Sequence, residues 1–399
     1  MAVSSDKGTE AYVEKVYYRE YAVSVEYNQR EVWQMRTFGN TAKECFFRLI
    51  RLGLHIEGCI SLPVMNDGLW AEIFFMAQKQ ALTGVMMEAL NRLPEEVNRP
   101  NEEQRIKLMK VALKAEKINM AADMEAVRWT EFFGNRGYKS MLLKGQGLAM
   151  LYPNPRMRMP GDTDLWVMGD SGCIRKLCRD ELGAREFTYH HIGVKGKNGM
   201  ELEVHTTPSW MYSFPKNRRL QRLFGLWSGT GREIVLSGAG RVCVPSDEMN
   251  RVFLLVHMYR HVFSEGIGLR QMADYAMLLR KGCTEEEKAV FGRQAKELNL
   301  YGFAGAVMYV MERVFGLDRN CLLTEPDSKK VEKLLDEVMA GGNFGKYDEK
   351  IDRTIKSDSA MSFLTRNARN FRLLKEYPEE VLWGPVFKVW HRGWRKMVK

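Results

Sequence analysis

Residues 161–167 read GDTDLWV, and they are the most informative stretch of this 399-residue chain. Asp162 and Asp164 alternate with Thr163 and lead into an apolar run, which predicts a strand with one buried face. Because alternate side chains of a strand share a face, the two carboxylates point the same way. Neighbouring carboxylates repel each other unless a cation neutralises them, and oxygen-rich pairs of this kind suit Mg²⁺. The stretch therefore predicts a strand that holds a metal ion.

Two further strand candidates follow, and the second of them adds a third carboxylate. Residues 185–194 and 200–206 are joined by the segment 195–199 (KGKNG), whose composition is typical of a hairpin turn. If the second strand pairs beside the aspartate strand, Glu203 approaches the two aspartates. Glu201 lies on the same face and is the alternative ligand. Three carboxylates around one or two metal ions form the arrangement that in-line phosphoryl or nucleotidyl transfer uses.

A glycine turn lies upstream of the acidic pair. Residues 143–147 (LKGQG) place Gly145 between a strand candidate and a helical turn, and free backbone amides at such a junction bind phosphate well. Arg156 and Arg158 lie between this turn and the carboxylates, where they are suited to contact a polyphosphate or to offset the charge of departing pyrophosphate. Lys144 either contacts phosphate or pairs with one of the carboxylates.

The histidines in two further sequence motifs do not form a zinc-binding motif. His257 and His261 are four residues apart on a predicted helix, which is a spacing that metal ligands use in some proteins. No Glu follows His257 as in a zinc peptidase, so we interpret both as ordinary packed or exposed histidines. His190 and His191 alternate on a strand, so at most one of them faces the carboxylates, and the same interpretation is favoured for them.

Beyond these motifs, the chain divides into an appended N-terminal segment and three folded regions. Residues 1–39 are rich in tyrosine and charge, residues 40–135 and 236–399 show helical periodicity, and residues 136–235 carry the strand candidates. We therefore predict an α+β fold, in which a small mixed-sheet core is flanked by N- and C-terminal helical regions. Helices are expected near 41–52, 70–77, 101–134, 172–182, 246–262, 268–281, 284–297, 300–315 and 327–340, and in the tail 378–399.

Composition restricts the kinds of partner and the compartment. The net charge of +10, from 60 basic and 50 acidic residues, permits an anionic partner such as a nucleotide, a nucleic acid or a membrane surface without demanding one. The seven cysteines are scattered, so neither a disulfide framework nor a structural zinc site is expected. No apolar run approaches the ~20 residues that span a bilayer, and the polar N-terminus does not resemble a signal peptide. We expect a cytoplasmic protein without stable membrane insertion.

Three motifs together resemble a known family. They are LKGxxLA from Leu143, LYPxPxxR from Leu151 and GDxDLxV from Gly161. This combination is similar to bacterial nucleotidyltransferases of the DNA polymerase β-like superfamily, whose pattern is a glycine turn, an acidic pair one residue apart and a third acid on a later strand. The segment 268–274 (GLRQMAD) resembles the region after that core, less specifically, and the resemblance covers roughly residues 41–390.

The resemblance implies a role for each matched position. Gly145 matches the turn glycine, Asp162 and Asp164 the metal-binding pair, and Glu203 the third acid. His205 resembles the histidine that often follows this acid in the family. The sequence departs from the pattern in three positions and in one spacing. Gln146 stands where the superfamily prefers Ser or Gly, Thr163 is a polar residue between the acids, and the third acid is Glu instead of the commoner Asp. The stretch from the turn to the acids is also longer than usual.

The implied activity is a metal-dependent transfer of NMP from an NTP to a hydroxyl acceptor, with release of pyrophosphate. Mg²⁺ or Mn²⁺ would be bound by the three acids, which would be the catalytic residues. The acceptor is a small molecule, a protein side chain or an RNA end. One alternative is a non-catalytic nucleotide-binding or regulatory module with the same fold, and another is a nucleic-acid-binding protein. The residues expected to bind the nucleotide are Lys144, Gly145, Gln146, Arg156, Arg158 and His205.

Overall fold

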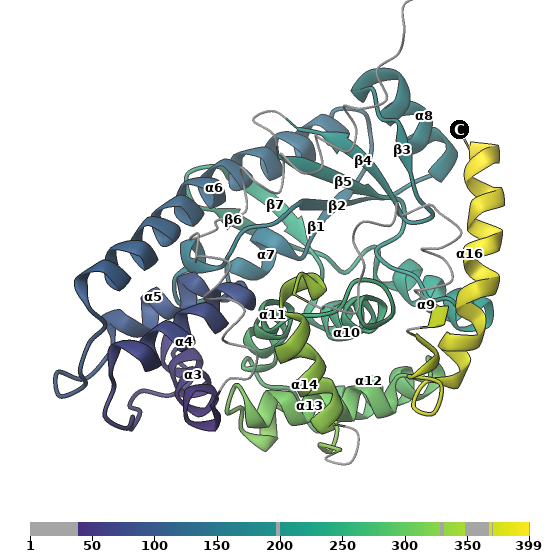
Figure 1. Ribbon diagram of the computed structural model, residues 1–399. Coiled ribbons are helices and arrows are strands. Elements are labelled where there is room, and N and C mark those ends of the chain that lie inside the picture. The colour runs from purple at the N-terminus through teal and green to yellow at the C-terminus, as the bar shows by residue number, and fades with distance from the viewer. Residues whose placement is uncertain (1–38, 197–199, 328–330, 348–366, 369, 399) are drawn as a thin grey trace, which may run out of the picture.

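A small sheet with helices packed around it forms the described part of the chain (Figure 1). The combination of a mixed sheet and flanking helices confirms the predicted α+β fold class. The N-terminal segment predicted at 1–39 lies outside the described residues, apart from Gly39. The computed structural model describes residues 39–196, 200–327, 331–347, 367–368 and 370–398.

The sheet has five strands in the order β1-β2-β5-β4-β3. It is mixed because β2 and β5 run parallel while the other neighbouring pairs are antiparallel. A parallel pair requires a crossover connection, and α8, β3 and β4 lie between β2 and β5 in the chain. The strands are β1 (Ser140–Leu143), β2 (Thr163–Val167), β3 (Glu186–Phe187), β4 (His191–Lys195) and β5 (Glu201–His205).

One face of the sheet is apolar and is covered by two helices. Leu165 of β2 and Val204 of β5 are fully buried, and they belong to one core cluster with Phe133 of α6 and Ile174 of α8. The helices are α6 (Glu102–Gly134) and α8 (Ser171–Leu182), as predicted from the apolar periodicity. Side chains alternate along each strand, so the acidic residues of β2 and β5 project from the opposite face.

The prediction of one continuous strand at 185–194 is wrong. This segment forms two strands, β3 and β4, with a tight turn between them. β3 and β4 pair antiparallel, with Phe187 opposite Ile192. The Thr188 hydroxyl donates to the His191 carbonyl and accepts a hydrogen bond from the His191 backbone N–H. A side chain that satisfies backbone groups in this way competes with continued strand pairing, and here it closes the turn.

The N-terminal helical region contains its predicted helices and one that was not predicted. Asn101 caps α6 by accepting a hydrogen bond from the Gln104 backbone N–H. The unpredicted helix α5 packs so closely on the segment before β2 that a Cβ added to Gly84 would lie 2.0 Å from the Met157 carbonyl oxygen. The helices before α6 are α3 (Asn40–Gly53), α4 (Asp67–Lys79) and α5 (Thr83–Asn91).

The C-terminal region is helical, as predicted, but a short hairpin precedes it. The strands β6 (Arg232–Leu236) and β7 (Gly240–Val244) were not predicted, and β7 contacts both β1 and α6. The boundary expected after residue 235 falls within β6, and the division into domains stays a prediction. One helix before the hairpin, α9 (Phe214–Trp227), was also not predicted. The helices after the hairpin are α10 (Asp247–Phe263), α11 (Leu269–Leu279), α12 (Glu285–Glu297), α13 (Tyr301–Arg313), α14 (Val331–Gly341) and α16 (Pro378–Val398).

Short elements complete the description. The five-residue helix α7 (Gly145–Ala149) follows β1 directly. Single turns of 3-10 helix occur at η1 (Pro155–Met157), η3 (Arg319–Cys321) and η5 (Asn343–Gly345). Among the helices that the structure describes, none combines the length and the apolar character that crossing a membrane requires.

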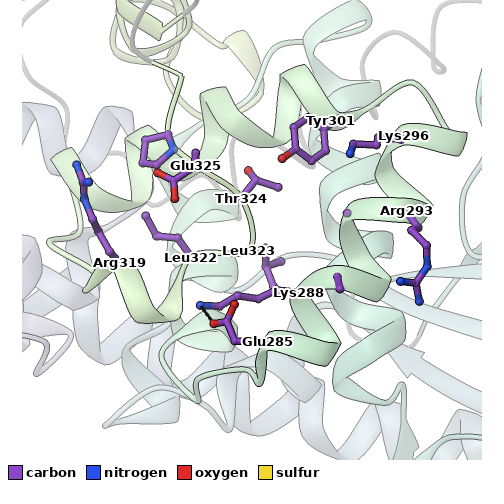
Figure 2. Close-up of a pocket in the computed structure, with 13 residues that line it drawn as sticks. Glu285, Lys288, Arg293, Lys296, Tyr301, Arg319, Leu322, Leu323, Thr324 and Glu325 are labelled. Carbon is purple, nitrogen blue, oxygen red and sulfur yellow. Dashed lines mark hydrogen bonds and ion pairs between the residues drawn. The ribbon is translucent and has the colours of Figure 1, made fainter.

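A surface hollow of about 490 Å³ lies among the C-terminal helices (Figure 2). Residues of α12, the start of α13 and the segment 319–326 line it. Both signs of charge are present, because Lys288 pairs with Glu285 at 2.8 Å while Lys296 lies over the Tyr301 ring. The hollow shares no lining residue with the acidic face of the sheet, so the two features are separate places on the molecule.

A buried ion pair connects the segment before β2 to the C-terminal helices. Arg158 donates from Nε and Nη2 to the two carboxylate oxygens of Asp274 in α11, each at 2.8 Å, and both side chains are almost fully buried. The Tyr152 hydroxyl donates to the same carboxylate at 2.8 Å. From the other side, Asn119 of α6 donates to the carbonyls of Arg156 and Arg158. The segment that leads into the aspartate pair is therefore held between α6 and α11.

We expect Asp274→Ala to lower the free energy of unfolding by about 3–5 kcal/mol, because it leaves the guanidinium of Arg158 buried without its counter-ion. The matched control is Glu181→Ala. It also removes a carboxylate that accepts two hydrogen bonds from an arginine, but the Arg136–Glu181 pair is exposed, so the loss should stay below about 1 kcal/mol. Chemical denaturation measures both variants, and equal losses would contradict the structural role given to Asp274.

Candidate active site

Three carboxylates converge beside the parallel pair of strands. The register of β2 and β5 places Asp164 opposite Glu203, and Asp162 directly precedes β2. One oxygen from each of the three lies within 4.8 Å of the others. The predicted approach of Glu203 to the aspartates is confirmed, whereas Glu201 is not a member of this group. Asp164 is buried, Glu203 is partly exposed and Asp162 is exposed, so the group is open to solvent on the side of Asp162.

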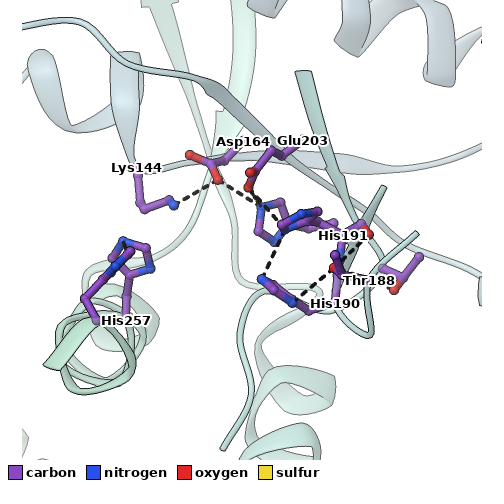
Figure 3. Close-up of polar contacts among 10 residues, drawn as sticks. Lys144, Asp164, Thr188, His190, His191, Glu203 and His257 are labelled. Atoms are coloured by element: carbon purple, nitrogen blue, oxygen red, sulfur yellow. Dashed lines mark hydrogen bonds and ion pairs between the residues drawn. The ribbon is translucent and has the colours of Figure 1, made fainter. Parts of the chain in front are cut away.

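Two cationic side chains contact the buried aspartate. Lys144 Nζ lies 2.8 Å from Asp164 Oδ1 (Figure 3). His205 Nε2 lies 2.9 Å from the same oxygen. His205 Nε2 is also 3.3 Å from Glu203 Oε2. Of the two interpretations open for Lys144, the structure therefore shows the pairing with a carboxylate. These contacts offset part of the repulsion among the three acids.

The protonation of these groups follows from their mutual contacts. Burial alone would lower the pKa of His205, but its hydrogen bonds to Asp164 and Glu203 outweigh burial and raise the pKa from 6.5 to about 9. Burial would raise the pKa of Glu203, but the neighbouring His191 and His205 outweigh it and lower the pKa to about 2. Burial likewise opposes the charge of Lys144, yet the nearby acids raise its pKa overall. At neutral pH the site therefore holds an ionised Glu203 beside a protonated Lys144 and a protonated His205.

The backbone at Lys144 adopts a conformation that side-chain-bearing residues rarely take. Its φ is 47° and its ψ is −142°, and Gly145 follows with a φ of 43°. Such backbone is uncommon for a residue with a Cβ, and the surrounding structure must hold it in place. The turn carries the chain from β1 into α7 while Lys144 reaches the acids. Gly145 thus occupies the position of the predicted glycine turn.

Three side chains that were predicted to contact nucleotide have partners within the protein. Gln146 Nε2 donates to Asp123 Oδ1 at 2.7 Å, and Arg156 pairs with the other oxygen of the same carboxylate. Arg158 is bound to Asp274, as described above. These contacts connect α7 and η1 to α6 and α11. The nucleotide-binding roles of Gln146, Arg156 and Arg158 stay predictions.

Four histidines that we interpreted from the sequence as ordinary packed or exposed residues lie around Lys144 and the three carboxylates. His191 Nδ1 is 3.3 Å from Glu203 Oε2, and His190 Nε2 is 3.1 Å from His191 Nδ1. On α10, His257 and His261 contact each other at 3.1 Å between their Nε2 atoms, and Figure 3 shows His257 on the helix that faces Lys144. Burial lowers the pKa of all four, and the charge of Lys144 lowers it further. The HH doublet and the HxxxH spacing were visible in the sequence, but only the fold brings them together.

Comparisons with known proteins agree with the sequence resemblance. Residues 66–316 match a family model described as uncharacterised nucleotidyltransferase, and this span includes every strand and all three carboxylates. The chain is also similar to a crystal structure of an antigenic nucleotidyltransferase-like protein from Paracoccidioides brasiliensis. That similarity has 15% sequence identity and a TM-score of 0.34, and it covers 52% of this chain and 95% of the other.

A comparison with curated proteins gave no match. The family model, in contrast, matches more than half of the chain, and the protein therefore belongs to the nucleotidyltransferase family that this model describes.

Proposed function

We propose that this protein is a metal-dependent nucleotidyltransferase that transfers NMP from an NTP to a hydroxyl acceptor and releases pyrophosphate. The observation that carries the proposal is the convergence of Asp162, Asp164 and Glu203 on one face of the sheet in a member of this family. Carboxylate oxygens are the ligands that Mg²⁺ and Mn²⁺ prefer, so the donor set fits such an ion. When bound there, the ion supplies charge neutralisation and polarisation of the reacting phosphate.

Glu203 is assigned to metal binding in this proposal. The other role considered for it is to accept the proton of the attacking hydroxyl. A carboxylate with a pKa of about 2 is a weak base at neutral pH, and this disfavours proton acceptance. Asp162 is the most accessible of the three acids, and it offers an oxygen to both metal and solvent.

Lys144 and the turn at Gly145 are proposed to hold the triphosphate. The ammonium of Lys144 already lies beside the acids, where a metal-bound phosphate would meet it. Arg156 and Arg158 act in this proposal by holding the segment before β2 against Asp123 and Asp274. The flanking helices would supply the pocket for the acceptor, whose identity stays open among a small molecule, a protein side chain and an RNA end.

A non-catalytic nucleotide-binding module is the second candidate, and one observation favours it. Lys144 and His205 both contact Asp164 Oδ1, so this acid is neutralised without any bound metal. A protein that only binds nucleotide has no need to exchange these contacts for a metal ion. The two candidates differ in chemistry, because the module would bind an NTP without releasing pyrophosphate.

We expect thermal unfolding of the wild type to show a stabilisation that requires both a divalent metal and one of the four NTPs. A ligand at about 100 times its Kd stabilises by about 2.7 kcal/mol. Asp162→Ala should abolish this stabilisation while leaving the fold intact, because Asp162 is exposed. Asp180→Ala, on the exposed surface of α8, is the matched control and should keep it.

The same samples separate the two candidates. Pyrophosphate release with a hydroxyl acceptor supports the transferase, and stabilisation without any release supports the module. No metal-dependent stabilisation by any NTP would contradict both.

The stability of the metal-free protein should depend on pH through His205. Its folded-state pKa of about 9 lies above the ordinary 6.5, so its stabilisation is complete below about pH 6.5 and is lost as the pH rises through 9. A shift of this size corresponds to at most about 3 kcal/mol. We expect the stability advantage of the wild type over His205→Gln, measured by urea unfolding in EDTA, to shrink across this range. His55→Asn, at a histidine outside the site, gives the background, and a pH-independent advantage would refute the role of the His205 charge.

A further inference from the structure

A second group of ligand atoms lies next to the three carboxylates. His191, Glu203 and His205 each offer one atom, and these atoms all lie within 4.8 Å of one another. The antiparallel register of β4 and β5 produces this group, because it pairs His191 directly with His205. Glu203 lies two positions before His205 on β5 and therefore shares its face. The two groups have Glu203 in common, but the second is built mainly from imidazoles.

The distances within this second group are those found between the ligands of one metal ion. Glu203 Oε2 is 3.3 Å from His191 Nδ1 and 3.3 Å from His205 Nε2. Ligands that bind Zn²⁺ tetrahedrally at ~2.0–2.2 Å lie about 3.3–3.6 Å apart. Both nitrogens therefore stand at coordination spacing from one carboxylate oxygen without any movement of the strands.

We propose that His191, Glu203 and His205 form a site for a divalent transition-metal ion of the Zn²⁺ class, separate from the all-oxygen site of Asp162, Asp164 and Glu203. Imidazole nitrogens are ligands for zinc and its neighbours, whereas Mg²⁺ prefers oxygen and binds imidazole poorly. Three protein ligands with an open fourth position are the pattern of zinc sites that bind water or substrate.

The burial and the charges around His191 and His205 favour a bound cation beside these two imidazoles. His205 is almost fully buried and His191 is partly buried, so few waters compete for their nitrogens. The hydrogen bond between His190 Nε2 and His191 Nδ1, at 3.1 Å, would be replaced by the metal–nitrogen bond. The ion would replace the proton that His205 Nε2 shares with Asp164 Oδ1, at 2.9 Å, and Glu203, and Asp164 would then add a negative charge next to the ion. Because Glu203 belongs to both groups, it would serve as a ligand whichever of the two groups holds an ion.

The test uses Co²⁺ as a spectroscopic probe on the full-length, metal-stripped protein without nucleotide. Co²⁺ bound by imidazoles in a four- or five-coordinate site has intense visible bands, which are weak for an all-oxygen octahedral site. We expect the wild type to show these bands at one equivalent, to lose them when Zn²⁺ is added in equal amount, and to keep them in a large excess of Mg²⁺.

Variants assign the bands to one of the two groups. His191→Ala removes a ligand of the imidazole group alone and should weaken Co²⁺ binding at least 10–100-fold, which is about the loss that even outer-shell partners cause. Asp162→Ala removes a ligand of the acidic group alone and should keep the bands. His55→Asn, at a histidine outside both groups, should also keep them.

Two results would overturn the proposal. One is the absence of imidazole-type Co²⁺ bands in the folded wild type, and the other is bands that survive His191→Ala but disappear in Asp162→Ala. Neither result touches the nucleotide-dependent stabilisation, which is measured with Mg²⁺ and an NTP. Failure of the imidazole site and failure of the proposed transferase activity are therefore distinguishable.

Discussion

Mutual repulsion among three carboxylates is the constraint on which the rest of the site depends. The parallel pairing of β2 with β5 brings Asp162, Asp164 and Glu203 together, and burial of Asp164 reduces the screening of their charges by water. Lys144 and His205 offset this repulsion, because both contact the buried Asp164. Lys144 reaches it from a turn with a positive φ, so the chain accepts an unfavourable backbone conformation at the place where a positive charge is needed.

The helical regions hold this charged group in position. Asn119 of α6 and Asp274 of α11 bind the segment before β2 from opposite sides, and Arg270 of α11 adds a hydrogen bond to the Pro160 carbonyl. Since the aspartate pair follows directly, the position of its carboxylates depends on helices that lie on both sides of the core in the sequence. Rigid support of this kind is what keeps reacting groups in productive geometry. Arg158 was interpreted from the sequence as a phosphate ligand. In the structure it forms a buried ion pair with Asp274, and this pair is part of the same support.

The periodicity of apolar residues along the sequence was enough to predict the α+β class and to predict which side chains of β2 and β5 share a face of the sheet. The alternation of apolar and acidic residues in 161–167 and 200–206 placed the three acids on matching faces, and the approach of Glu203 to the aspartates then depended on the pairing of the two strands, which the structure shows. What escaped prediction depends on contacts between distant residues. The partner of Arg158 lies 116 residues away, and His257 lies near Lys144 only because the fold places α10 opposite it (Figure 3). The turn that divides β3 from β4 was not predicted, and hydrogen bonds of Thr188 to His191, through both its hydroxyl and its backbone N–H, close it.

The two interpretations of Lys144, as a phosphate ligand and as a partner of a carboxylate, are compatible in the proposed enzyme. Without ligands, its ammonium lies 2.8 Å from Asp164 Oδ1 and offsets the repulsion of the acids. In the proposed enzyme a bound divalent cation would supply this neutralisation, and the ammonium of Lys144 would then contact a phosphate oxygen. Binding of metal and of nucleotide would then favour each other, because the triphosphate would offset the positive charge of the metal ion and Lys144, and the metal ion would offset the negative charge of the triphosphate and the acids. The contact between Lys144 and Asp164 is therefore compatible with the proposed transferase as well as with a nucleotide-binding module.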